Sequence, residues 1–313
     1  MALSGLLKPS LKLILFGGKG GVGKTTCASA AGLYLSGHGL NTLLISTDPA
    51  HSLSDSLQRD IGHEVTRLEG MDNLSAIEIS AEEALEDFKM QYYDELKRLF
   101  ETSTYLDAED IESLLGLPIP GIDEVMGFKK IVDLIDEGGF DKYIVDTAPT
   151  GHALRLLGLP ELLDDWIKVM AKMRWKYRYM VSSFAGRYSP DSADDFLVSM
   201  KKTVRKIDAL LSDRNRCEFI VVTIPEDMAV KETRRLVDSL RHSRVNVNQL
   251  IINNVVPEGG CGFCRSRRQG QDKYIREIQE QFSDLSTTVV LLQPSEIKGP
   301  DALRNIGDVL IAG

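Results

Sequence analysis

The chain has 313 residues, of which 43% are apolar and 27% charged, so it has the composition of a globular protein and is neither disordered nor fibrous. Its formal net charge is −9, with 46 acidic against 37 basic residues, so nucleic acid is not an expected partner. No apolar run approaches the roughly 18–20 residues of a membrane span, and we expect a soluble cytoplasmic protein without stable membrane insertion.

Short runs rich in Val, Ile and Leu alternate with helical patterns along much of the chain. Continuous apolar runs are typical of strands buried on both faces, as in a parallel sheet. The alternation therefore predicts an α/β fold with a doubly wound, mostly parallel sheet. Strands are expected at 11–16, 42–47, 143–147, 219–224, 249–252 and 288–292, and helices at 24–37, 128–137, 229–242 and 271–282.

Residues 81–127 and 153–215 interrupt this alternation with helical patterns and no strand run. We interpret them as an inserted helical subdomain, and residues 1–80, 128–152 and 216–313 as the sheet domain. The second insertion carries an apolar stripe at spacings of three and four, which taken alone marks a core face more often than a binding surface. Its members are Leu163, Trp166, Met170, Met173, Tyr177, Met180 and Met200.

A glycine-rich loop follows the first predicted strand and precedes a helix, and it matches the P-loop pattern GxxxxGK[ST]. Its backbone N–H groups are expected to surround the β-phosphate of a nucleotide, next to the positive end of the helix. Lys24 is expected to reach the β- and γ-phosphates, Thr25 to ligate Mg²⁺ and Thr26 to contact the α-phosphate. The other residues of the loop are Gly18, Lys19, Gly20, Gly21, Val22 and Gly23.

Two aspartates follow predicted strands whose carboxyl ends meet at the same edge of a parallel sheet. Asp48 is our choice for orienting the attacking water, although a turn carboxylate is a common reading of an Asp-Pro pair. Asp146 ends the run YIVD, which is the Walker B pattern, and is expected near Mg²⁺ through a water.

The segments GKGGVGKTT, STDPAHSLSD, DTAPTGHALRLL and EIKG together resemble the arsenite-pump ATPase family over nearly the whole chain. They look like its single-domain branch, which targets tail-anchored membrane proteins, in the form found in archaea or elsewhere outside animals and fungi. The resemblance implies a P-loop domain with a helical subdomain. It also implies a homodimer, with higher oligomers left open.

The resemblance also implies roles for individual residues. Lys19 matches the extra lysine that crosses the dimer interface to the partner's nucleotide. The adenine and nucleotide contacts of the family fall on Glu226, Asn253 and the loop Gln293, Pro294 and Ser295.

Cys261 and Cys264 match the CxxC pair of the family. A structural zinc site needs four ligands, so a twofold axis would have to bring the second pair, giving one Zn²⁺ per dimer. Free thiols or a redox pair are the alternative. There is no cysteine between Cys27 and Cys217, which disfavours the metalloid site of the arsenite-binding members.

The function that this resemblance implies is a nucleotide-driven switch. ATP and Mg²⁺ close the dimer, the helical insertions form a groove for the client's membrane segment, and hydrolysis releases the client at an unidentified membrane receptor. The alternatives are an arsenite- or antimonite-stimulated transport ATPase and a partition or septum-positioning ATPase. A binding module that uses ATP only as a structural ligand is opposed by the intact set of Lys24, Asp48 and Asp146.

Overall fold

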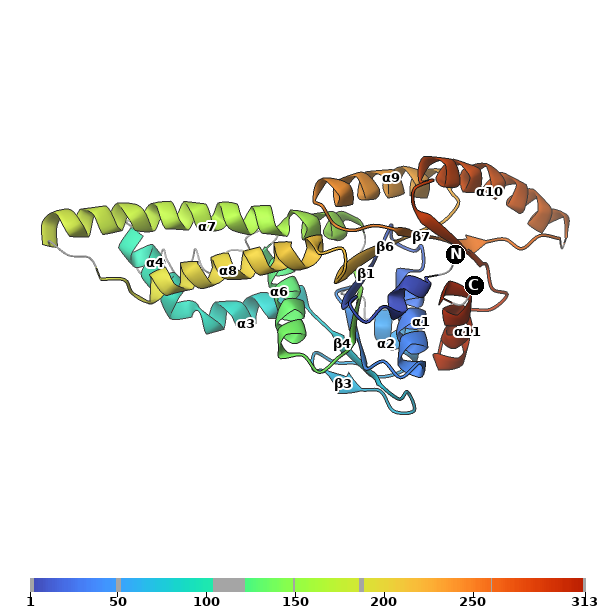
Figure 1. The fold of residues 1–313 in the computed structure, drawn as a ribbon, viewed down its shortest axis with the longest axis horizontal. Coiled ribbons are helices and arrows are strands. Elements are labelled where there is room, and N and C mark those ends of the chain that lie inside the picture. Colours follow the sequence, from blue (N-terminus) through green and yellow to red (C-terminus); the bar gives the residue numbers. More distant parts are fainter. Residues whose placement is uncertain are drawn as a thin grey trace. The chain divides into compact units, whose positions relative to one another are not determined.

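The computed structural model describes residues 3–48, 52–103, 122–148, 150–185, 189–259 and 261–311 (Figure 1). The chain divides into two compact units. We call the first the sheet unit; it comprises Met1–Ser80, Leu134–Leu157 and Leu210–Gly313. The second is the helical unit, which comprises Ala81–Asp133 and Gly158–Ala209.

The sheet unit contains an eight-stranded sheet in the order β3-β4-β2-β5-β1-β6-β7-β8. Every neighbouring pair is parallel except β3 and β4, which confirms the predicted α/β class. Strands β1, β2, β5 and β6 are buried along their whole length, as their unbroken apolar runs predict. The strands are β1 (Leu13–Gly17), β2 (Thr42–Ser46), β3 (Thr66–Arg67), β4 (Leu74–Glu78), β5 (Lys142–Asp146), β6 (Cys217–Thr223), β7 (Gln249–Val255) and β8 (Ser286–Leu291).

Strands β3 and β4 were missed in the sequence, because β3 has two residues and the run LSAIE in β4 is interrupted by Ser75 and ended by Glu78. The helices of the sheet unit pack on this sheet. Ile14 and Phe16 of β1 and Ile220 and Val222 of β6 share one core with apolar residues of α1 and α11. These helices are η1 (Ser4–Leu7), α1 (Lys24–Gly37), α2 (Ser52–Leu57), α9 (Asp227–His242), α10 (Gly262–Gln281) and α11 (Pro300–Ile311).

The helical unit contains α3 (Ala81–Gln91), α4 (Tyr93–Ser103), and most of α6 (Ile122–Glu137), α7 (Thr150–Ala185) and α8 (Ser192–Ser212). Phe88, Tyr92 and Phe196 form an aromatic cluster in it, with ring centroids 5.0–6.1 Å apart. Helices α6, α7 and α8 run without a break through three of the four boundaries between the units, so the sequence pattern does not locate these three. The fourth boundary, after Ser80, coincides with the start of α3. Among the described residues, no helix is long and apolar enough to cross a membrane.

Candidate active site

The glycine-rich loop connects the carboxyl end of β1 to the first turn of α1. Two of its glycines are required by close packing. A Cβ atom at Gly18 would lie 2.1 Å from the Val222 carbonyl oxygen, and one at Gly23 would lie 2.3 Å from Asn253 Nδ2. Gly23 also has φ +93°, a left-handed conformation that favours glycine, and it caps the N-terminus of α1. The loop therefore presents its backbone N–H groups and a helix N-terminus, which is the geometry of an anion site.

The side chain of Lys24 folds back over this loop. It is buried, with 5% of its surface exposed, and its Nζ lies 3.4 Å from the Lys19 carbonyl oxygen. Burial lowers the pKa of Lys24, while the negative charges of Asp146 and Asp48 act in the opposite direction. A buried ammonium group beside an anion site is suited to binding a phosphate group.

Asp146 lies at the end of β5 and is fully buried. Its Oδ2 accepts a hydrogen bond of 2.6 Å from Thr25 Oγ1, while its buried Oδ1 has no hydrogen-bond partner among the described residues. Burial raises the pKa of Asp146 to about 7, against the effects of Thr25 and Lys24. A buried carboxylate oxygen without a partner, next to a threonine hydroxyl, fits Mg²⁺ or one of its waters.

Asp48 reaches the same edge of the sheet from β2. In the register of β2 and β5, Ser46 is opposite Asp146, and on the other side of β5 Phe16 is also opposite Asp146. The Asp48 N–H donates to Ser46 Oγ at 3.2 Å. The charge of Asp48 contributes to the pKa of both Lys24 and Asp146, so the three side chains share one electrostatic environment.

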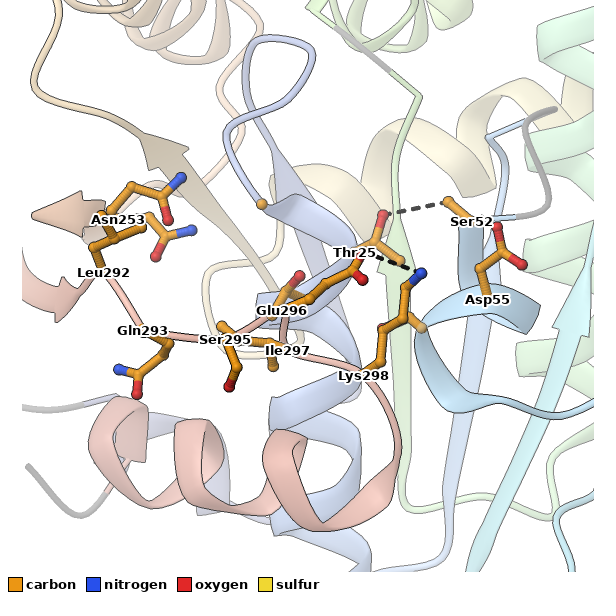
Figure 2. A pocket seen from close by; sticks show the side chains of 14 residues that line it. Thr25, Ser52, Asp55, Asn253, Leu292, Gln293, Ser295, Glu296, Ile297 and Lys298 are labelled. Carbon is orange, nitrogen blue, oxygen red and sulfur yellow. Dashed lines mark hydrogen bonds and ion pairs between the residues drawn. The ribbon is translucent and has the colours of Figure 1, made fainter.

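A cavity of about 460 Å³ adjoins the first turn of α1 (Figure 2). Of the residues predicted to bind nucleotide, Gly23, Thr25, Thr26, Asn253, Gln293 and Ser295 line it. The sequence reading missed a second set, contributed by α2, the end of β7 and the loop after β8. This set is Ser52, Asp55, Ser56, Asn254, Leu292, Glu296, Ile297 and Lys298. Five of these residues lie within the segments STDPAHSLSD and EIKG, which was the only signal for them, whereas Ser56, Asn254 and Leu292 lie outside both segments.

The remaining residues with predicted nucleotide contacts lie in different surroundings. Asn253 is buried and its Nδ2 donates to the Val22 carbonyl oxygen at 2.9 Å, so it braces the phosphate loop as well as lining the cavity. Glu226 caps the N-terminus of α9, and neither it nor Pro294 lines the cavity; both are exposed. Lys19 Nζ lies 4.0 Å from Glu232 Oε1 of α9.

The two cysteines of the CxxC pair lie at the N-terminus of α10, with their sulfur atoms 3.7 Å apart. The pKa of the Cys261 thiol is lowered, mainly by hydrogen bonds from Cys264, and that of Cys264 is raised by Cys261. No group of three or more potential metal ligands occurs in the part of the chain that the structure describes. The pair supplies two sulfur atoms, fewer than the four ligands of a structural zinc site.

The predicted client stripe needs a correction. Met170 and Met200 are 2% and 1% exposed and lie in the core of the helical unit, so in this conformation they offer no surface to a client. Met173 and Tyr177 are half-buried and Met180 is exposed, while the side chains of Leu163 and Trp166 lie outside the described ones. Among the described side chains of α7 and α8, the large apolar ones that are exposed are Val169, Trp175, Tyr179, Met180 and Val198.

Residues 11–312 match the family described as anion-transporting ATPase. The chain is 35% identical to ATPase ASNA1 homolog 2 of Paramecium tetraurelia, over 98% of this chain and 95% of the relative. It is 35% identical to ATPase GET3C of Arabidopsis thaliana, over 96% and 82%, and 30% identical to ATPase get3 of Schizosaccharomyces japonicus, over 98% and 94%. The chain therefore belongs to the anion-transporting ATPase family and is an enzyme that hydrolyses ATP.

Proposed function

We propose that this ATPase is a cytoplasmic targeting factor that binds the transmembrane segment of tail-anchored proteins and releases it at a membrane after ATP hydrolysis. The observation that carries the proposal is the exposure of large apolar side chains on the helical unit of an ATPase. Trp175 is 64% exposed, Tyr179 67% and Val169 59%. Trp175 and Tyr179 stack with ring centroids 6.0 Å apart, and contiguous exposed apolar surface marks a site for an apolar partner.

The sequence resemblance to the tail-anchored targeting branch supports the same reading, as do near full-length relatives named ASNA1 homolog and GET3. A tail anchor is an apolar helix of about 20 residues that must be kept from water. Apolar side chains on two helices suit such a segment, because a helix can lay its apolar face into a groove between them. We assign the client surface to the exposed residues of α7 and α8, in place of Met170 and Met200.

For hydrolysis we assign distinct roles to four side chains. Lys24 binds the β- and γ-phosphates, and Thr25 and Asp146 hold Mg²⁺, which supplies charge neutralisation when bound. Asp48 orients the attacking water from the carboxyl end of β2. The assignment is supported by their shared edge of the sheet and by the partnerless oxygen of Asp146.

We further propose a homodimer in which Lys19 crosses to the partner's nucleotide and two CxxC pairs hold one Zn²⁺. Four sulfur ligands at about 2.3 Å from zinc in a tetrahedron lie about 3.8 Å apart. The observed distance of 3.7 Å between Cys261 Sγ and Cys264 Sγ fits this requirement. Zinc binds the thiolate form; the pKa of the Cys261 thiol is lowered in its favour, while that of Cys264 is raised.

The catalytic assignment is tested with Asp48→Asn. This variant should bind Mg²⁺–ATP and retain a co-expressed client, because phosphate and client contacts are unchanged, but its steady-state turnover should fall by at least about 100-fold. Normal phosphate release from Asp48→Asn would refute the role of Asp48.

The client surface is tested by co-expression with a tail-anchored protein and purification of the complex. Trp175→Asp with Tyr179→Asp should abolish client recovery and leave ATP hydrolysis intact. Met228→Asp is the matched control, since Met228 is 57% exposed on α9 of the sheet unit and should not affect recovery. Equal recovery of the client with all variants would refute the proposal. Stimulation of ATP turnover by arsenite or antimonite would favour the transport alternative.

A further inference from the structure

Helix α2 contacts the phosphate-binding side of the nucleotide site and is held from β4. The Oγ atom of Ser52, its first residue, lies 3.3 Å from Thr25 Oγ1. The backbone N–H and the hydroxyl of Ser54 both donate to Glu78 Oε1, each at 3.1 Å. Helix α2 begins four residues after Asp48, so its position bears directly on the segment to which we assign hydrolysis.

The same helix is also joined to the loop after β8. The Gly299 N–H donates to the Ser56 carbonyl oxygen at 2.9 Å. Just before this bond, Lys298 Nζ lies 3.0 Å from Glu296 Oε1 of its own loop. Figure 2 shows the ammonium group of Lys298 between the carboxylates of Glu296 and Asp55, and Asp55 belongs to α2.

The loop itself forms one side of the cavity. Gln293, Ser295, Glu296 and Lys298 all line the cavity, and all are exposed. Glu296 and then Asp55 raise the pKa of Lys298, so the ammonium form persists across the physiological range. A nucleotide base that binds against this loop would therefore lie beside a cation next to α2.

We infer that Lys298 is a positioning residue that couples occupation of the base-side loop to helix α2, and through α2 to the segment that carries Asp48. The inference rests on the hydrolytic role proposed for Asp48. Lys298 makes nucleotide hydrolysis depend on the base as well as on the phosphates. A misplacement of about 1 Å at a reacting centre costs up to about 100-fold in rate, so a small shift of α2 is sufficient.

The ion pair of Lys298 adds little to stability, because both partners are largely in solvent, with 44% and 73% of their side chains exposed. Removing it should therefore leave a folded protein. The variants are Lys298→Met, which removes the charge, and Lys298→Arg, which keeps it. Arg304→Met is the matched control: Arg304 lies on α11, pairs with Asp301 at 3.0 Å and is 48% exposed, but it does not line the cavity.

The measurements are kcat and KM for Mg²⁺–ATP, the Kd for ADP, and kcat for Mg²⁺–tripolyphosphate, which has no base. We expect Lys298→Met to lower kcat for ATP about tenfold, with the Kd for ADP and the slower tripolyphosphate rate unchanged within about twofold. Lys298→Arg should restore most of the ATP rate, and Arg304→Met should match the wild type.

Three results would overturn the inference. A raised KM or Kd with unchanged kcat would make Lys298 a nucleotide contact. An equal loss of kcat with ATP and with tripolyphosphate would make Lys298 a general structural residue. An unchanged kcat with both substrates would show that Lys298 has no role in hydrolysis. Asp48→Asn, assayed in parallel, separates failure of this coupling from failure of the hydrolysis assignment, and client recovery is independent of both.

Discussion

The oxygen of Asp146 without a partner is the clearest sign that the protein keeps a ligand site formed in advance. An ionised carboxylate in this buried position is costly unless a cation or hydrogen-bond donors compensate it. Thr25 satisfies one oxygen, and Lys24 supplies positive charge without a contact that satisfies the other. The raised pKa of Asp146 is the consequence, and it makes the stability of the ligand-free protein depend on pH.

The direction of this dependence follows from proton binding. The pKa of Asp146 is about 7 in the folded protein against an ordinary value of 3.8, so the folded state binds more protons between pH 4 and 7. The free energy of unfolding should therefore fall as pH rises through this range and level off above it. Asp146→Asn should remove this contribution, on the order of 4 kcal/mol at most, in urea unfolding with EDTA and no nucleotide. Parallel pH profiles for the two proteins would contradict the prediction.

A second residue-scale prediction concerns Gly23. Gly23→Ala combines φ +93° with a Cβ atom 2.3 Å from Asn253 Nδ2, so Asn253 must release Val22 or the loop must move. We expect at least a tenfold weaker Kd for ADP and a loss of about 1–3 kcal/mol in stability. Gly39→Ala is the control, since Gly39 has φ +82° but no atom within 4 Å of the added Cβ. If both variants bind ADP equally, the contact with Asn253 has no role in binding.

At this scale, the sequence predicts features that depend on local backbone conformation, but it does not predict contacts between residues that are far apart in the chain. The phosphate loop could be recognised because its glycines, Lys24 and Thr25 are contiguous. Asn253 was placed near the base, but its bond to Val22 joins residues 231 positions apart and leaves no local pattern. Lys298 and Asp55 enter one cavity from separate elements for the same reason.

At the scale of the element, α7 illustrates why helices are easier to predict than their buried faces. Arg174 carries a charge, yet it is 3% exposed, because it pairs with Asp191 and Asp194 at the start of α8. The apolar Trp175 and Tyr179 are exposed and stack on each other, with ring centroids 6.0 Å apart. Residue type alone would assign each of these side chains to the opposite environment, and the ion pairs formed in the fold account for the burial of Arg174.

The burial of the methionines gives a prediction for these helices. Met170→Ala and Met200→Ala should each destabilise the helical unit by about 2–5 kcal/mol, because each leaves a cavity in a packed core. Val198→Ala, on the exposed face of α8, should change stability by no more than about 0.5 kcal/mol. Both tryptophans, Trp166 and Trp175, belong to the helical unit, so urea unfolding monitored by tryptophan fluorescence reports on it. If the two methionine variants unfold at the same urea concentration as the wild type, Met170 and Met200 do not contribute to the core and belong again to the proposed client surface.

At the scale of the whole molecule, one chain brings together Lys24, Thr25 and Asp146, whereas the proposed zinc site takes only two of its four ligands from one chain. The helical unit begins at the start of α3, where the predicted insertion also begins, but its other boundaries fall inside α6, α7 and α8, where no sequence feature marks them. Dimer formation is independent of this division into units, and the proposed zinc binding by the CxxC pair allows it to be tested.

The proposed dimer predicts a definite metal content. The purified protein should contain one Zn²⁺ per two chains by mass spectrometry of the metal and should have the mass of a dimer by light scattering. Cys264→Ser should lose the zinc and shift the protein toward the monomer, because the two thiolates that remain in the dimer do not close a Cys₄ site. Cys27→Ala is the control, since Cys27 is buried in α1 and its thiol pKa is raised to about 12 by burial, which removes it from zinc chemistry. A dimer that persists in Cys264→Ser without zinc would show that another surface holds the two chains together.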